Sequence, residues 1–136
     1  MKVIGFNFTK LSAQRMKVSV DDLKISTEMD VPEIIKTESP LIKTKEDLLE
    51  ASFIYKVNYE PGFAKVELEG KVLFSVDSKI AEDVLKNWKK KSVPEDFKIL
   101  LFNIVMKKSA LKALTLCDDL NLPAHVPLPT MKKNKE

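Results

Sequence analysis

The sequence predicts a single α+β domain, in which an antiparallel β-sheet of about four strands is followed by a short and a long helix packed on one of its faces. Strand-forming and polar residues alternate in several stretches up to Val76, and apolar residues then recur at helical spacing up to about Leu120. The chain has 136 residues, the size of one domain. We place this domain at residues 1–130.

The first two predicted strands are Val3–Thr9 and Leu23–Val31, both with side chains that alternate along the strand. In the second strand, the apolar and the charged or polar side chains separate onto opposite faces. Pro32 has no N–H to donate, so it either ends this strand or marks a sheet edge. In the first strand, Ile4, Phe6 and Phe8 are expected to share one face, opposite to the face of Val3, Gly5 and Asn7.

The third and fourth strands give the clearest signal in the sequence. A polar stretch without a clear period, Thr37–Asp47, is expected to be a loop. Leu49–Tyr59 and Ala64–Val76 then alternate regularly, and the Pro61-Gly62 turn signal lies between them. These features predict a long antiparallel hairpin with one buried and one solvated face.

Two helices should follow the hairpin. Asp77 or Ser78 can cap the first, and Ser92–Glu95 resembles a capping box for the second, which should run from about Glu95 to about Leu120. The first half of the second helix is apolar almost all round, which predicts a deep core position or a subunit interface. The interface candidates are Phe97, Leu101, Phe102 and Val105.

After the second helix, three prolines between Asn121 and Pro129 exclude a helix and favour an extended path. The last residues, 131–136, are basic and, apart from Met131, polar, and we expect a disordered tail there.

The composition limits the classes of protein to consider. The net charge of +3 is lower than a dedicated nucleic-acid binder usually carries. With Cys117 as the only cysteine, an internal disulfide is impossible, and a reducing compartment fits. No stretch is apolar and long enough for a membrane span or a signal peptide, so we expect a cytoplasmic protein.

Catalytic machinery is not visible in the sequence, and we expect no enzyme, no metal and no cofactor. The three glycines lie far apart, so they form no phosphate-binding loop. The only histidine, His125, and Cys117 lack a second pair of ligands for zinc. Cys117 lies on an apolar helical face and is best explained as a buried side chain, and His125 as a loop residue that packs or faces water.

Two groups of side chains are candidate binding surfaces. Lysines surround Trp88 at positions 86, 89, 90 and 91 and could hold phosphate, although solvation of a helix end explains them better. The stripe of Phe53, Tyr55 and Tyr59 is more typical of a core than of a groove. Tyrosine is amphipathic, however, and also suits a partly exposed surface.

The order of elements resembles the SecB-like protein-export chaperone family, including small archaeal-type members. Strands, a short helix and a long helix lead into Leu120–Leu128, whose Leu-Asn-Leu-Pro start is similar to the loop after the long helix in that family. The Trp88-Lys89 region and the helix around Asn103 are similar to the archaeal members. The resemblance covers the topology of the whole chain and about a third of its residues.

The resemblance implies a nucleotide-independent homo-oligomer, a dimer or a tetramer, that holds unfolded or pre-export polypeptides and does no chemistry. The implied client contacts are Phe53, Tyr55, Leu122, Val126 and Leu128. Proteobacterial members are acidic and carry a further C-terminal helix and tail, whereas this chain is slightly basic. A general or single-client holdase is therefore a better expectation than one that docks on a protein translocase. The alternative is a small RNA- or ribosome-associated protein, whose binding would fall steeply with salt.

Overall fold

The computed structural model describes residues 1–16, 22–39, 45–90 and 92–133. Residues 40–44 of the expected loop, the last lysine of the cluster beside Trp88, and residues 134–136 of the expected tail lie outside the described residues.

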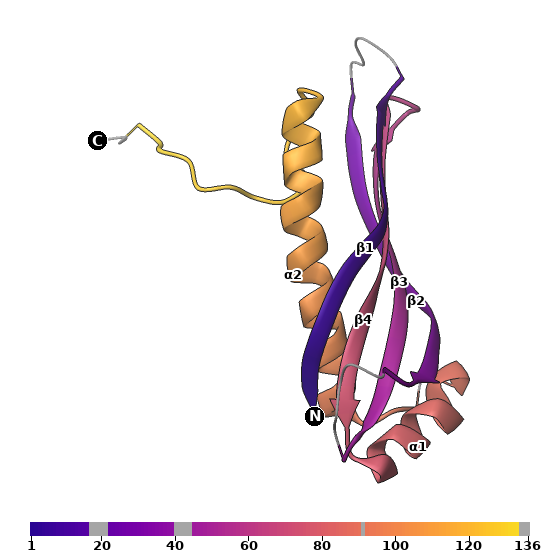
Figure 1. Cartoon of the computed structure of the whole chain (residues 1–136). Coiled ribbons are helices and arrows are strands. Elements are labelled where there is room, and N and C mark those ends of the chain that lie inside the picture. Colours follow the sequence, from indigo (N-terminus) through magenta and orange to yellow (C-terminus); the bar gives the residue numbers. More distant parts are fainter. Residues whose placement is uncertain (17–21, 40–44, 91, 134–136) are drawn as a thin grey trace.

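Four antiparallel strands form one long, twisted sheet (Figure 1). They are β1 (Lys2–Arg15), β2 (Lys24–Thr37), β3 (Asp47–Glu60) and β4 (Ala64–Val76), in the spatial order β1-β4-β3-β2. The predicted hairpin is the central pair β3 and β4, so the strands with the clearest alternation lie in the middle of the sheet. The two strands with the weaker patterns form its edges.

Both edge strands are longer than the sequence indicated, because each continues through a bulge. The register of β1 against β4 shifts after Val3 and again after Phe8. The first shift places Val3 on the same face as Phe6 and Phe8, so the expectation that it faces the other way is wrong. In β2 the register shifts between Asp30 and Glu33. Pro32 falls in this bulge, where its missing N–H interrupts no ladder.

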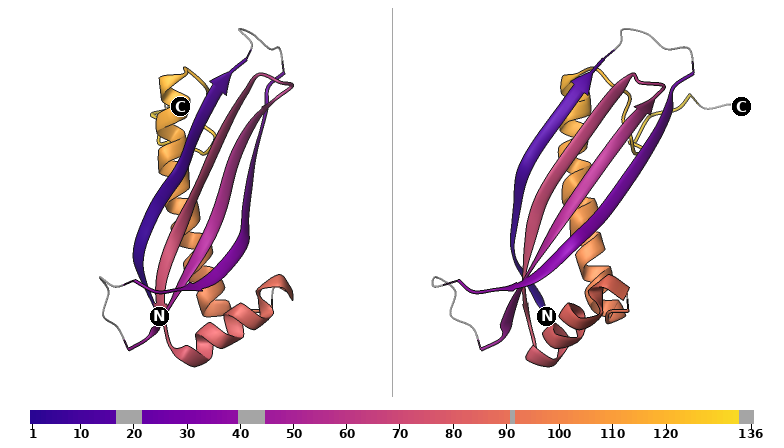
Figure 2. Two further views of the ribbon diagram at one scale, coloured as in Figure 1. Left: turned by 45° about the vertical axis from the view of Figure 1, so that its right-hand side comes forward. Right: turned by 90° about the vertical axis from the view of Figure 1, so that its right-hand side faces the viewer.

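The two helices cover one face of the sheet, here called the inner face (Figures 1 and 2). The short helix α1 (Ser78–Asn87) begins at Asp77, whose carboxylate accepts a hydrogen bond of 3.1 Å from the Lys79 N–H. A 3₁₀ turn, Trp88–Lys90, leads to the long helix α2 (Glu95–Asp119). Its N-cap is Pro94, and no side chain caps it, so the predicted capping box does not form.

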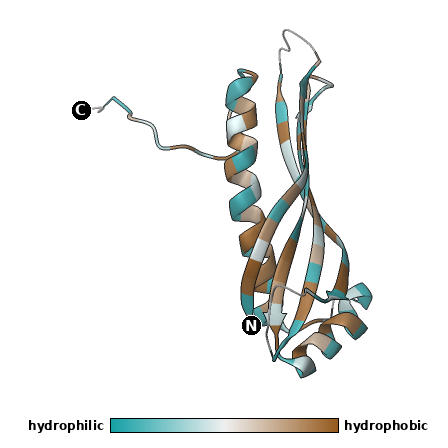
Figure 3. Ribbon diagram, in the orientation of Figure 1, coloured by the Kyte–Doolittle hydropathy of each residue, from teal (hydrophilic) through white to brown (hydrophobic). Residues whose placement is uncertain are grey.

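The side chains between α2 and the sheet form two clusters along the length of the inner face. The apolar cluster lies under the first half of α2 and contains Phe53, Phe74, Phe97, Leu101 and Val105. The tyrosine cluster lies under the second half and contains Tyr55, Tyr59, Ala113, Cys117 and Leu122. The hydropathy of α2 follows this division, because its first half is largely apolar and its second half mixed (Figure 3).

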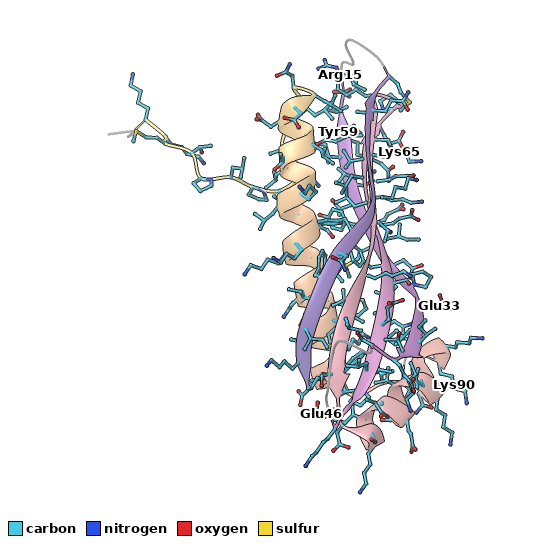
Figure 4. All side chains as sticks on the ribbon, in the orientation of Figure 1. Arg15, Glu33, Glu46, Tyr59, Lys65 and Lys90 are labelled. Atoms are coloured by element: carbon cyan, nitrogen blue, oxygen red, sulfur yellow. The ribbon has the colours of Figure 1, made fainter. Side chains whose placement is uncertain are left out.

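The opposite, outer face of the sheet is polar. Tyr59 points toward α2, whereas Lys65 lies on the other side of the sheet (Figure 4). Glu67 forms ion pairs with Lys65 at 2.6 Å and with Lys10 at 2.9 Å. The hydrogen bond from Lys65, followed by the one from Lys10, lowers the pKa of the Glu67 carboxyl to about 2. This face is therefore solvated and ion-paired. Among the described residues, no helix is long and apolar enough to cross a membrane.

Candidate functional site

The most informative part of the molecule is the segment Asn121–Val126, here called the exit segment, which leaves α2 and returns along the inner face of the sheet. Asn121 has a positive φ of 55°, a conformation that often ends helices and that Asn adopts readily. The Leu122 N–H donates to the Cys117 carbonyl at 2.8 Å and satisfies one of the last helical acceptors. This reversal directs the chain along the β2 side of α2 (Figure 2).

Tyr59 fastens the start of the exit segment. Its hydroxyl donates to the Pro123 carbonyl and lies 3.0 Å from the Cys117 sulfur. A phenol has one proton, so the Cys117 thiol is the donor in the second contact. Burial raises the pKa of both the Tyr59 hydroxyl and the Cys117 thiol. Both groups are therefore protonated at neutral pH, and Cys117 is the buried side chain that the sequence indicated.

Tyr55 fastens the end of the exit segment. Its hydroxyl lies 2.9 Å from Nε2 of His125, and the two rings meet edge to face at 6.0 Å between centroids. Nδ1 of His125 is buried and has no hydrogen-bond partner within the described part of the chain. Burial lowers the pKa of His125, so the ring is neutral at neutral pH. The two tyrosines thus hold a proline-containing, extended segment of polypeptide against the sheet.

Arg15, at the end of β1, supports the turn from which the exit segment starts. Its guanidinium donates to the carbonyls of Leu120 at 3.0 Å and Asn121 at 3.3 Å, and it lies 4.9 Å from the centre of the Phe63 ring. Sequence reasoning missed this residue because the first strand was expected to stop at Thr9. A cation at a helix C-terminus is favourable, but nothing in the sequence places Arg15 beside it.

A separate pocket, here called the Trp88 pocket, lies between β2, the 3₁₀ turn and the first half of α2. It has a volume of about 240 Å³. The Trp88 indole N–H donates to the Val31 carbonyl at 3.0 Å. The Lys98 ammonium lies 5.9 Å from the centre of the Phe102 ring. The lining residues are Met29, Asp30, Val31, Trp88, Val93, Lys98 and Phe102. The pocket is thus mainly apolar and aromatic, with one acid and one base.

The structure separates the residues that the resemblance implied for client contact. Phe53, Tyr55 and Leu122 are only 1%, 3% and 7% exposed, respectively. Val126 is half-buried, whereas Leu128 is 54% exposed. Phe53 packs in the apolar cluster, while the exit segment itself covers Tyr55. Of these five residues, only Val126 and Leu128 are open to a partner without rearrangement.

The residues expected at a subunit interface also divide into two groups. Phe97, Leu101 and Val105 have no exposed surface, because they pack against the sheet of their own chain. These three residues are therefore not accessible to a second subunit. Phe102 is half-buried and borders an outward-facing stripe with Ile99 and Met106, which are 50% and 45% exposed.

The lysine cluster beside Trp88 does not form an open stacking platform. Lys86, Lys89 and Lys90 are exposed, but the Trp88 ring is half-buried and its N–H is bonded to β2. Among the residues that the structure describes, no three His, Cys, Asp or Glu side chains cluster closely enough to hold a metal ion.

The comparisons with known proteins agree with this architecture. The chain is similar in structure to the Mycobacterium tuberculosis Rv1957 SecB-like chaperone, solved in complex with a ChAD peptide from the Rv1956 HigA1 antitoxin. The TM-score is 0.52 with 13% sequence identity, and the match covers 98% of this chain and 92% of that one. No protein-family model and no curated protein matches the sequence. The fold is therefore SecB-like, as the sequence indicated.

Proposed function

We propose that this protein is a SecB-like holdase that binds unfolded polypeptides without nucleotide and does no chemistry. The observation that carries the proposal is the SecB-like fold, shared along nearly the whole length of both chains with a chaperone that holds a peptide. The proposal extends that relation from fold to activity.

The exit segment supports this proposal by its chemistry. The segment is extended and contacts the inner face in three ways. The Leu122 side chain is buried, the Pro123 carbonyl accepts a hydrogen bond from Tyr59, and the His125 ring is hydrogen-bonded to Tyr55. Except for the ring of His125, these contacts use features that any polypeptide offers: apolar side chains and backbone carbonyls. A surface that binds its own extended chain in this way suits an extended client.

The client surface then has two parts. Val126 and Leu128 are accessible contacts from the start. Tyr55 and Leu122 join them when the exit segment lifts from the sheet and leaves its place to the client. Prolines at positions 123, 127 and 129 remove backbone donors from this apolar segment, so it offers little for edge-to-edge aggregation.

We further propose that copies of the chain associate through the outward stripe of α2 formed by Ile99, Phe102 and Met106. Such a stripe is what a helix leaves for a partner when its other apolar side is already buried. Docking on a translocase remains a separate proposal, for which a pull-down with the purified translocase motor is the direct assay.

The test of the holdase is a fluorescence-anisotropy titration with a labelled, permanently unfolded polypeptide at low and high salt. A folded polypeptide and a short RNA serve as comparison ligands. We expect binding to the unfolded polypeptide that changes little with salt, because salt screens interactions between charges and apolar contacts involve none. Salt-labile binding of the RNA alone would favour the ribonucleoprotein alternative.

A matched pair of variants tests the client surface. Leu128→Ser should weaken client binding by about fivefold to tenfold, since it removes most of one accessible apolar side chain. Leu111→Ser makes the same change at a leucine of α2 that is 58% exposed and does not belong to the tyrosine cluster, and it should leave binding unchanged. Equal effects of the two variants would contradict the proposed surface.

A further inference from the structure

The segment Pro127–Lys133, here called the arm, continues from the exit segment and stands away from the body of its own chain (Figure 1). Every residue of the arm is exposed, and Met131 has 101% of its surface accessible. Pro127 and Pro129 fix their own φ angles and favour an extended path. Met131 is thus a large, fully exposed apolar side chain two residues beyond a proline-containing, extended stretch.

The Trp88 pocket has the chemistry to receive this side chain. Aromatic-lined grooves are a recurring way to bind extended, proline-rich segments. Here Trp88 and Phe102 provide the rings. A methionine side chain adapts to irregular spaces and makes favourable contacts between its sulfur and aromatic rings. The Val31 carbonyl is already bonded to the Trp88 indole, so the pocket offers side-chain packing at that point and not a free strand edge.

The pocket also offers carboxylates to the basic end of the arm. Lys132 and Lys133 directly follow Met131, and the arm contains no acidic residue. Asp30 lines the pocket, and Glu28 and Glu95 line the hollows on either side of it. The bases nearby are Lys98 in the pocket, Lys56 in a neighbouring hollow, and the exposed Lys89 and Lys90 that follow Trp88 in the chain. Lys98 lies over the Phe102 ring, so Asp30 is the charged group of the pocket that suits a lysine of the arm.

We propose that the arm of one copy docks in the Trp88 pocket of a second copy, with Met131 between Trp88 and Phe102 and the following lysines beside Asp30. The second copy is favoured over the arm's own chain because the arm leads away from its own sheet, and alternate prolines favour continued extension over reversal. From Val126 to Met131 the arm reaches about 15 Å in an extended, polyproline-like conformation, enough to bridge to a neighbour. Phe102 also belongs to the stripe of α2 that we assign to contacts between copies. This inference does not depend on the holdase activity.

The test uses the full chain with Met131→Asp, which removes the anchor from the arm and leaves the pocket open. A synthetic peptide of residues 127–136 is titrated into this variant. Trp88 is the only tryptophan, so its emission reports on the pocket alone. We expect a saturable change in emission. Phe102→Ser in the same background should weaken the affinity by about tenfold, whereas Leu111→Ser, at a leucine of α2 that is 58% exposed and does not line the pocket, should not change it.

Three outcomes would overturn the proposal. The first is a titration with no saturable change in emission. The second is equal affinity for a peptide of the same composition in scrambled order, which would make the pocket a general apolar site. The third is an unmodified chain that shows the bound emission while sedimenting as a monomer at every concentration, which would mean that the arm docks on its own chain. Emission and sedimented mass that rise together with concentration, and that both fall in Met131→Asp, would support exchange between copies.

Discussion

The two clusters on the inner face of the sheet hold their partners in different ways. The apolar cluster binds the first half of α2 through side chains that carry no polar group, such as Phe53, Phe74 and Phe97. The tyrosine cluster binds the second half of α2 and the exit segment through hydroxyl groups that meet Cys117, the Pro123 carbonyl and His125. The first half of α2 is therefore held mainly by apolar packing, while the second half and the exit segment also depend on side-chain hydrogen bonds.

The largest expected effect tests the apolar cluster. Leu101→Ala should lower the free energy of unfolding by about 2–5 kcal/mol, because it leaves a cavity beneath α2. Denaturant unfolding followed by circular dichroism measures this change. Leu111→Ala, on the exposed side of the same helix, should stay within about 0.5 kcal/mol of the unmodified chain. A small loss for Leu101→Ala would mean that the first half of α2 is not held by this cluster.

The second prediction concerns the fit of the apolar cluster on the sheet itself. A Cβ added at Gly70 would come closest to the backbone carbonyl oxygen of Asn7, and it would also meet the Cζ of the Phe53 ring at 2.6 Å. Gly70→Ala should therefore cost about 2–3 kcal/mol through overpacking, again measured by denaturant unfolding. The double variant Gly70→Ala/Phe53→Leu should recover part of that loss. If it recovers nothing, the clash with the neighbouring Asn7 backbone is the main cause.

A smaller effect is expected in the tyrosine cluster. Tyr59→Phe keeps the ring but removes the hydroxyl that meets Pro123 and Cys117, which should cost about 1–2 kcal/mol. Hydrogen exchange should rise in the exit segment far more than in β3. Uniform exchange along the chain would show that the exit segment does not open separately, and would remove the basis for its exchange with a client.

The smallest effect is the dependence of the exit segment on pH. Burial lowers the pKa of His125 in the folded chain below its ordinary value of 6.5. The undocked segment therefore takes up a proton first, and the stability from docking is fully present above that value. It should be lost progressively as the pH falls from about 6.5 through the lower folded pKa. His125 is the only histidine, so its ring proton in NMR spectra follows the titration directly.

The control for the pH prediction is His125→Gln, which keeps a polar group near Tyr55 but does not titrate. Hydrogen exchange of the exit segment in this variant should be independent of pH once the intrinsic exchange rate is removed. A His125 ring that titrates at or above its ordinary pKa would show that it is not buried against Tyr55 in solution.

The sequence alone was sufficient for the central hairpin and the helices. Residues 49–59 and 64–76 alternate without interruption, and this period fixes both the strands and the face that each side chain takes. The extent of both helices likewise follows from helical spacing. The sequence left Asp77 and Ser78 open as caps of α1, and the structure has Asp77 as the cap. The bulges of β1 and β2 could not be predicted from the sequence, because a bulge breaks the alternation on which strand prediction rests.

The candidate site shows the same division. The sequence predicted an extended, proline-containing segment after α2, because proline chemistry is local, and the family resemblance implied Leu122, Val126 and Leu128 in it as client contacts. Only the tertiary structure decided that this segment turns back at Asn121, that Tyr55 and Tyr59 bind it, and that Arg15 supports its turn. It also decided which of Phe97, Leu101, Phe102 and Val105 stay accessible. Periodicity says which side chains are apolar, but only the assembled sheet and helices determine which of them are already covered.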